Sequence, residues 1–364
     1  MRIAMVNSIR SYGGGEKRVL RGAHEFRRRG HEVLVIGRPG AELTTRAREQ
    51  QIPCAEAPLR HYLSPASIVA LASRLRRFGP EVVVSYDEKA VRLCALAGLL
   101  RRRRPALVHY YGLEGAFKNK PHNRYVVGPR VDCFLCNASA LRDELRSFGW
   151  ILERKLRVIH GGVDPAPIEE ADPAGVREEL GAAPGDIVAL VVARLVPEKG
   201  HAFLVDALRK VVPGYPQLRV WLAGDGPDAE GLERQGSELG LSAAVRLLGF
   251  RADVPRLLRA ADLMIHPSRR EGAPNSVREG MVARLPVAAV AASGTPEVVV
   301  DGETGLLSPV GDAEAFRRNL ERLLSDADLR RRMGEAGRRR ALAEFSEDRC
   351  AERWLELLEE VRRK

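Results

Sequence analysis

Two glutamates, Glu271 and Glu279, stand with seven residues between them in the stretch EGAPNSVREGMVARLPVAAV, one before and one after the expected start of a helix. Ser276 and Glu279 have the spacing of a capping box, in which each side chain bonds a backbone N–H of the other residue. Glu279 could therefore serve only to start the helix. The capping box leaves Glu271 unexplained, so this pair is the first candidate for chemistry.

Two cations form a second candidate. The segment VVARLVPEKG ends an expected strand with Arg194, and Lys199 follows at a helix entrance. Fixed cations at the carboxyl edge of a parallel sheet are costly to hold together without an anion. Two solvated loop charges are the alternative, and in isolation the simpler one. Gly224 in LAGDGP and Gly249-Phe250 in RLLGF end further strands on the same rim.

A glycine-rich turn, SYGGGEKRV, places Gly13, Gly14 and Gly15 just before a helix. Glycines there let backbone amides approach a phosphate at the positive end of the helix. The turn is not the dinucleotide-binding pattern GxGxxG, and any tight strand-to-helix loop could use such glycines.

The elements that must position these residues alternate along all 364 residues. Nearly continuous apolar runs, each followed by a helical pattern, indicate parallel strands covered on both faces. The predicted strands span 2–7, 32–37, 81–86, 106–111, 132–137 and 156–160 in the first half, and 186–194, 218–224, 245–250, 262–267 and 286–290 in the second. The fold class is therefore α/β, with two Rossmann-like, doubly wound domains.

The Pro- and Asp-bearing segment 161–175 interrupts both patterns and is the best linker candidate. We expect domains at 1–163 and 164–346, with a closing helix over 347–364 that begins after an N-cap at Ser346 and packs back on the first domain. In such a chain the carboxyl ends of the strands would face a cleft between the domains.

The net charge of +11 is unevenly distributed. Residues 1–165 contain 30 Lys and Arg against 15 Asp and Glu, whereas the remainder contains 29 against 33. A basic first half attracts membrane headgroups, nucleic acid or a phosphorylated substrate. An arginine-rich proteome that decorates solvated helices explains the excess equally well. Aromatic residues make up only 5%, which argues against stacking on single-stranded nucleic acid.

The five cysteines are scattered, which suits reduced thiols in a cytosolic protein. Cys133 and Cys136 resemble a CxxC motif, but residues three apart on a strand face opposite sides, so we expect no metal site there. No run long enough to span a membrane and no secretory signal is apparent. We expect a cytoplasmic protein, with peripheral contact to the inner membrane face as a compatible addition.

The motifs ARLVPEKG, LAGDGP, LLGF, ADLMIHPSRREGAPNSVREGMVARLPVAA and SGTPEVVVDGETGLL, in this order, resemble those of the retaining glycosyltransferases of family 4, which have the GT-B fold. The resemblance covers nearly the whole chain and is most specific from 190 to 310. The Glu-x7-Glu signature of that family corresponds to Glu271 and Glu279.

The resemblance implies roles for these residues. Glu271 would contact hydroxyls of the donor sugar, Glu279 would hold the ribose of the nucleotide, and Arg194 and Lys199 would bind the diphosphate. Preorganised cations and helix-start amides would stabilise the leaving phosphate where other transferases use a divalent metal, so no cofactor is expected. The other expected donor-binding residues are Gly14, Gly15, Gly224, Gly249, Phe250, Gly272, Ala273, Pro274, Asn275 and Ser276.

The acceptor side departs from the family pattern. Many members have a histidine before a small residue after the fourth strand, and here Tyr111 stands at that position, with His109 two residues earlier. Either side chain could take the acceptor-side role, and His109 could equally be an ordinary buried histidine. Glu114, Lys118, Lys120 and Arg124 follow in a basic loop that suits an anionic or lipid-linked acceptor, or that is merely a solvated connection.

The resulting expectation is a metal-independent, retaining glycosyltransferase that uses a nucleotide-diphosphate sugar, with UDP as the family's commonest nucleotide, in cell-envelope or polysaccharide synthesis. Two alternatives remain open at this point. One is a nucleotide-sugar epimerase of the same architecture, and the other is a non-catalytic protein that binds anions or membranes.

Overall fold

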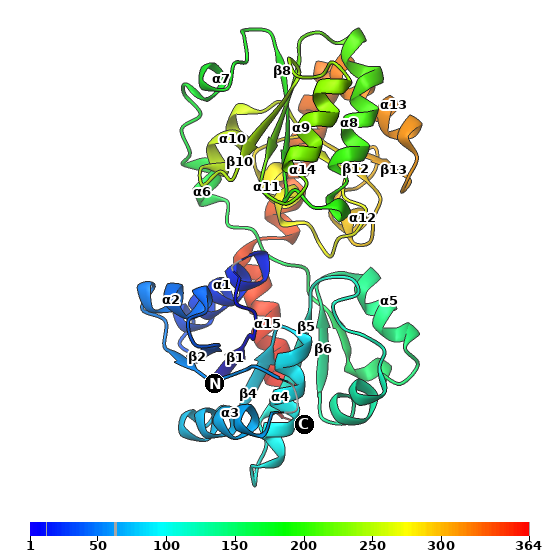
Figure 1. Ribbon diagram of the computed structural model, residues 1–364. Helices are drawn as coiled ribbons and strands as arrows, with labels where there is room; N and C mark the ends of the chain where they lie inside the picture. The colour runs from blue at the N-terminus through cyan, green and yellow to red at the C-terminus, as the bar shows by residue number, and fades with distance from the viewer. Residues whose placement is uncertain (12, 62–63, 364) are drawn as a thin grey trace. The chain divides into compact units, whose positions relative to one another are not determined.

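A computed structural model describes residues 1–11, 13–61 and 64–363. The chain forms two compact units (Figure 1). Unit 1 comprises Met1–His160 together with Asp348–Lys364, and unit 2 comprises Gly161–Glu347. Both units are α/β, as the alternation of apolar runs and helical patterns predicts.

Unit 1 contains a parallel seven-stranded sheet in the order β3-β2-β1-β4-β5-β6-β7. Its strands are β1 (Arg2–Val6), β2 (Glu32–Gly37), β3 (Cys54–Glu56), β4 (Val82–Ser85), β5 (Ala106–Tyr111), β6 (Cys133–Cys136) and β7 (Leu156–Val158). The central strands are buried along almost their whole length, because helices cover both faces of the sheet. Its helices are α1 (Gly14–Arg28), α2 (Glu42–Glu49), α3 (Pro65–Phe78), α4 (Glu88–Leu99) and α5 (Ser139–Ser147), with a π-helical turn over Asn123–Val127.

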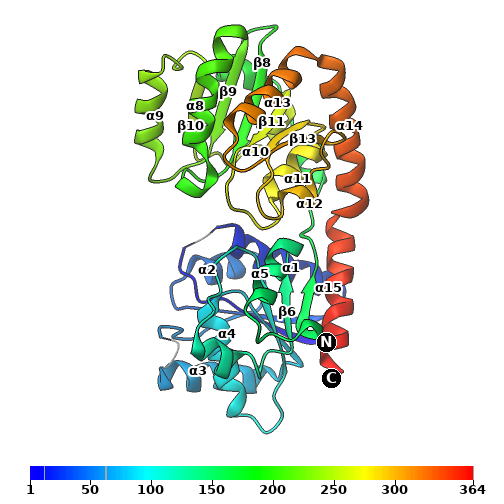
Figure 2. The same cartoon turned by 90° about the vertical axis from the view of Figure 1, so that its right-hand side faces the viewer.

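The last helix, α15 (Glu347–Arg362), belongs to unit 1 and lies beside α1 in two perpendicular views (Figures 1 and 2). The Trp354 ring lies 6.1 Å from the ring of Phe26 and 5.7 Å from that of Tyr110. At the start of the helix, Asp348 accepts hydrogen bonds from Arg28 of α1 and from Arg29, which directly follows α1. A buried aromatic cluster and ion pairs therefore fix the C-terminal segment on unit 1.

Unit 2 contains a parallel six-stranded sheet in the order β10-β9-β8-β11-β12-β13. Its strands are β8 (Ile187–Val192), β9 (Leu218–Ala223), β10 (Val245–Gly249), β11 (Leu263–His266), β12 (Val287–Val290) and β13 (Gly305–Ser308). Its helices are α6 (Ala166–Glu169), α7 (Val176–Glu179), α8 (His201–Val211), α9 (Ala229–Glu238), α10 (Val254–Ala260), α11 (Asn275–Val282), α12 (Thr295–Val298), α13 (Ala313–Ser325) and α14 (Ala327–Glu344).

The eleven predicted strands all occur, with ends shortened by up to two residues. Two strands were not predicted, β3 and β13. The first is a half-buried strand of three residues at the sheet edge, and the second lies in a glycine-bearing loop sequence that reads as a turn.

The predicted linker 161–175 is partly structured. It contains α6, whose Ile168 is 3% exposed and packs in the core of unit 2, and it ends just before α7. Its prolines and aspartates therefore mark turns within unit 2.

Candidate active site

The loops at the carboxyl edge of the unit 2 sheet pack so closely that several positions exclude any side chain. Gly200, which follows a short 3₁₀ turn over Pro197–Lys199, has φ +72°, and an added Cβ would lie 2.1 Å from the carbonyl oxygen of Pro267. This contact fixes the segment after β8, which carries Lys199, against the segment after β11, which leads to Glu271. A glycine at 200 is therefore needed to bring the two candidate residues together.

The loop after β9 approaches the same segment. An added Cβ at Gly224 would lie 1.8 Å from Ala193 O, and one at Gly226 would lie 2.2 Å from Leu195 O. Gly224 N also donates to Gly249 O at 2.8 Å. The glycines of LAGDGP thus let the loops after β8, β9 and β10 meet beside Arg194. Phe250, next to Gly249, is 74% exposed.

Glu271 is the buried centre of this region. Its Oε1 forms an ion pair with Lys199 Nζ, accepts a hydrogen bond from Ser268 Oγ at 3.0 Å and lies 3.4 Å from His266 Nε2. Burial by itself would raise the pKa of Glu271, but contact with His266 and then Lys199 outweighs burial and lowers the pKa to about 2. Glu271 is therefore ionised at neutral pH.

The remaining two residues are open. Arg194 is 68% exposed, and its guanidinium lies 3.9 Å from Glu198. Glu279, in α11, is half-buried, and its carboxylate has no hydrogen bond or ion pair with any residue that the structure describes. The structure therefore brings Lys199 and Glu271 into contact and leaves Arg194 and Glu279 available to a ligand.

The capping-box interpretation of Glu279 is wrong. Helix α11 begins at Asn275, its N-cap is Pro274, and no side chain caps it. Ser276 therefore lies inside the first turn, two residues after the N-cap, because Pro274 already ends the extended segment. With no capping role, Glu279 is free for another function.

A buried arginine, which the sequence analysis did not single out, supports the turn between the two glutamates. Arg278 is 0% exposed. Its Nη2 donates to Ala273 O at 3.3 Å and to the Asn275 side chain, and its guanidinium lies 5.8 Å from the centre of the Phe345 ring. Gly272, Ala273 and Pro274 are buried beside it. Arg278 therefore fixes the orientation of the turn that precedes α11.

In unit 1, the glycine turn begins α1 rather than preceding it. Gly13 is the N-cap, and Gly14 and Gly15 are the first helical residues, with open space at both Cβ positions. The buried Glu16 accepts hydrogen bonds from Gly13 N at 2.9 Å and from Asn7 Nδ2 at 3.0 Å. The predicted boundary was wrong because Glu16 caps the helix from inside, so no polar N-cap side chain is needed.

The two acceptor-side candidates on β5 are both engaged inside unit 1. Their side chains share one face of the strand, because they are two residues apart on it. His109 is 2% exposed, its ring lies 5.2 Å from that of Phe117, and burial lowers its pKa to about 4. The Tyr111 hydroxyl donates to Glu144 Oε2 at 2.6 Å, and its pKa is raised by burial and then by that bond. The observed contacts favour structural roles for both.

The segment after β5 holds Glu114, Lys118 and Lys120. Glu114 is half-buried, and the two lysines are exposed. Arg124 is also exposed, and its guanidinium lies 5.5 Å from the centre of the Tyr125 ring. The loop therefore presents cations at the carboxyl edge of the unit 1 sheet.

Cys133 and Cys136 lie on opposite faces of β6, each in a different hydrophobic cluster, as their spacing predicted. Within the described residues, no three His, Cys, Asp or Glu side chains are grouped as metal ligands. None of the described helices is long and apolar enough to cross a membrane. Burial raises the pKa of the Cys136 thiol.

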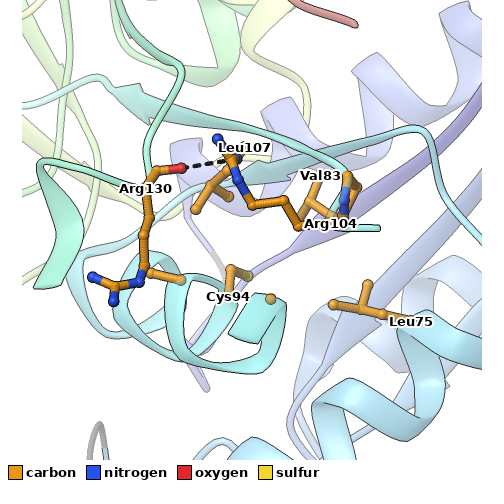
Figure 3. Close-up of a pocket in the computed structure, with 9 residues that line it drawn as sticks. Leu75, Val83, Cys94, Arg104, Leu107 and Arg130 are labelled. Carbon is orange, nitrogen blue, oxygen red and sulfur yellow. Dashed lines mark hydrogen bonds between the residues drawn. The ribbon is translucent and has the colours of Figure 1, made fainter. Parts of the chain in front are cut away.

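A small void in unit 1 is lined by none of the candidate site residues (Figure 3). It measures about 10 Å³, which is at the lower limit for one water molecule. Leu75, Cys94 and Leu107 line it, and Arg104, just before β5, donates to Arg130 O at 3.2 Å beside it. It is too small for a substrate and lies near the amino end of β5.

Sequence reasoning missed His266, Ser268 and Arg278. In the segment HPS, His266 ends β11 and its position alone suggests a structural residue, while nothing singled out Ser268, two residues later. Their position three to five residues before Glu271, at a strand end, was the available signal. Nothing in the sequence marked Arg278 as buried, because an arginine in a helix is normally solvated.

Comparison with known proteins defines the class of this chain. The family described as glycosyl transferases group 1 matches residues 175–340, and glycosyltransferase family 4 matches residues 12–167. The crystal structure of HepE from Anabaena in complex with UDP superimposes with a TM-score of 0.87 at 24% identity, covering 99% of this chain and 100% of that one. The fold is thus GT-B.

Relatives agree with this assignment. The lipopolysaccharide core biosynthesis glycosyltransferase LpsE of Rhizobium meliloti is 27% identical over 95% of this chain and 96% of its own. The putative glycosyltransferase EpsD of Bacillus subtilis is 35% identical over 53% of this chain and 52% of its own. The chain is a glycosyltransferase and belongs to family 4.

Proposed function

We propose that this glycosyltransferase takes its sugar from a nucleotide-diphosphate donor bound at the carboxyl edge of the unit 2 sheet. The observation that supports the proposal most directly is the buried ion pair between Lys199 and Glu271, with Arg194 and Glu279 open nearby in sequence. In this proposal Arg194 and Lys199 bind the diphosphate, Glu271 binds sugar hydroxyls, and Glu279 binds the ribose.

The chemistry of Glu271 suits that role. A carboxylate that is ionised at neutral pH can only accept hydrogen bonds, and sugar hydroxyls donate them. Its Oε1 is already used by Lys199 and Ser268, whereas Oε2 accepts no hydrogen bond from the described residues. An ammonium has three N–H donors, so Lys199 can hold Glu271 and a phosphate oxygen at the same time.

We propose a retaining reaction in which the acceptor attacks on the face that the phosphate leaves. The bond between the anomeric carbon and the phosphate oxygen breaks, and the bond between that carbon and the acceptor oxygen forms. The acceptor hydroxyl proton moves to the departing phosphate oxygen. Arg194, Lys199 and the amides at the start of α11 stabilise the charge that develops on the diphosphate.

We also propose that this stabilisation needs no divalent metal, because two cations and a helix start supply the positive charge. The test is transfer by the purified protein in excess chelator. An unchanged rate is expected, and loss of the rate with recovery on adding Mg²⁺ or Mn²⁺ would contradict metal independence without removing the other assignments.

The nucleotide and the biological role are inferred from the similar proteins. HepE was crystallised with UDP, and LpsE is named for lipopolysaccharide core biosynthesis. A UDP-sugar donor, a glycan, lipid-linked or small-molecule acceptor, and a place in envelope polysaccharide synthesis at the cytoplasmic membrane face are the corresponding proposals for this chain.

A panel of nucleotide sugars, screened for slow hydrolysis without acceptor, tests the donor class. Release of sugar and nucleoside diphosphate from one donor is expected, and NMR of the transferred sugar should show the donor's anomeric configuration. Inverted configuration would overturn the retaining mechanism. Conversion of the donor to its C2 epimer without acceptor would identify an epimerase instead.

A further inference from the structure

We propose that the segment 113–124 of unit 1, here called the basic loop, binds a phosphate group carried by the acceptor. The inference deepens the proposed function and rests on it for the identity of the ligand as an acceptor. It depends on three observations: the loop is anchored, the acid that contacts its end through Asn123 is paired with Arg92, and its cations have no acidic partner among the described residues.

The basic loop is anchored at both ends and in the middle. Gly115 N donates to Tyr111 Oη at 2.8 Å and to Glu144 Oε1 at 3.0 Å. Phe117 is 1% exposed and packs against Phe134. Farther along, Asn119 Oδ1 accepts a hydrogen bond from Trp150 Nε1 at 2.8 Å. The backbone is therefore fixed before any ligand arrives.

A buried cluster holds the end of the loop on α4. Asn123 is 0% exposed, and its Nδ2 donates to Glu88 Oε1 at 2.6 Å and to Lys118 O at 2.7 Å. Arg92 Nε donates to Asn123 Oδ1 at 2.7 Å, and Arg92 also forms an ion pair with Glu88. Arg92 thus neutralises Glu88, the acid that contacts the loop end through Asn123.

The cations of the loop remain without acidic partners. Lys118, Lys120 and Arg124 are exposed, and none of them has an ion pair with the residues that the structure describes. Elsewhere on this protein exposed arginines commonly pair, as Arg46 does with Glu42 at 2.6 Å. An anchored loop with several unpaired cations is repulsive by itself and gains stability from an anion.

Backbone hydrogen bonds keep these cations near one another. Arg124 N donates to Lys120 O at 3.1 Å, and Asn123 links the same turn to Lys118. The loop begins at the carboxyl end of β5, the edge of the sheet where ligands of open α/β sheets bind. A phosphate is the anion that suits a cluster of lysine and arginine donors.

Lysine footprinting tests the proposal one residue at a time. The full chain is treated with an amine-reactive reagent in the presence of inorganic phosphate, phosphatidylcholine vesicles, or vesicles that also contain phosphatidic acid. Mass spectrometry then measures the modification of each lysine. We expect Lys118 and Lys120 to react at least about threefold more slowly with the phosphate-bearing probes at low salt, with protection lost as salt screens the charges.

The same experiment separates the two sources of phosphate. Protection by inorganic phosphate and by acidic vesicles indicates recognition of the phosphate alone, whereas protection by acidic vesicles only indicates a lipid-borne phosphate. Unchanged reaction of Lys118 and Lys120 with every probe overturns the proposal. Protection of Lys199 by added UDP reports the donor site separately, so it distinguishes failure of the basic loop from failure of the proposed donor site.

A charge-neutralising variant of the loop gives a second test, and a variant of a distant lysine gives its control. Lys118→Gln/Lys120→Gln changes only exposed side chains and should reduce sedimentation with acidic vesicles at least about threefold if the lipid-borne phosphate is the ligand. Lys210→Gln removes an exposed lysine of α8 in unit 2 and should not. Equal loss in both variants would show a general charge effect and would contradict a site in the loop.

Discussion

Lys199 and Glu271 form an ion pair in which both side chains are mostly buried, at 16% and 11% exposure. The two residues are far apart in sequence and meet because Gly200 lets the segment after β8 contact Pro267. A buried ion pair adds little net stability, since removing both charges from water is costly. Its presence at a strand edge is better explained by ligand binding than by folding.

Replacement of Glu271 tests that explanation. Glu271→Gln keeps the shape but removes the charge and gives the side chain N–H donors where the sugar hydroxyls need acceptors. We expect kcat/KM for transfer to fall about 10²-fold. Steady-state kinetics with the identified donor would measure it. A Glu271→Gln enzyme with more than half of the wild-type kcat/KM would exclude Glu271 from sugar binding.

Arg194 has an unusually well-matched control. Arg194 is 68% exposed and lies 3.9 Å from Glu198, while Arg234 is 70% exposed and lies 3.9 Å from Glu230 four residues earlier. Arg194→Ala should lower kcat about 10²- to 10³-fold by removing a stabilising charge from the leaving phosphate. Arg234→Ala should leave kcat unchanged. Similar kinetics for the two variants would remove Arg194 from the site.

Glu279 is expected to contact the ribose of the donor. Glu279→Ala should raise KM for the donor roughly 10- to 100-fold, since a hydrogen bond to a charged group contributes about 1.5–3 kcal/mol. A donor analogue without ribose hydroxyls should affect the wild type by a similar factor and the variant little. If the variant and the wild type discriminate equally against the analogue, Glu279 does not bind ribose.

Arg278 is expected to act as a positioning residue. Arg278→Met removes the donor to Ala273 O and to the Asn275 side chain, so we expect the protein to fold with its free energy of unfolding lowered by about 1–3 kcal/mol. The turn at Ala273 and Asn275 loses its fixed orientation, and kcat/KM should fall at least about tenfold. Urea unfolding and kinetics together check this. Wild-type kinetics in a folded Arg278→Met protein would show that the turn needs no such support.

Buried His109 predicts a pH dependence of stability. Its folded pKa of about 4 lies below the ordinary value of 6.5, so the unfolded state binds the proton more tightly. This contribution to stability is complete above about pH 6.5 and is lost as the pH falls toward 4. The stability lost by pH 5 is roughly 2 kcal/mol. His109→Leu should lose less stability than the wild type between pH 7 and pH 5 in urea titrations. Parallel losses would contradict a buried neutral histidine.

Much of the fold followed from the sequence, because strands buried on both faces are continuous apolar runs. The short edge strand Cys54–Glu56 and the strand Gly305–Ser308 could not be predicted from such runs. The choice of Lys199 and Glu271 followed from motif order, but their contact did not, because it depends on how Gly200 meets Pro267. The burial of Arg278 and of the Arg92 cluster arises from tertiary packing that no local pattern records.

The most direct test of the donor site is calorimetric titration of nucleoside diphosphates. UDP, GDP and ADP are titrated into the wild type, into Arg194→Ala/Lys199→Met, and into the control Arg234→Ala. The account predicts that one nucleotide binds the wild type and the control alike, and that the double variant binds it at least about tenfold more weakly because the diphosphate loses both cations. Equal affinity in all three proteins would contradict a diphosphate held by Arg194 and Lys199.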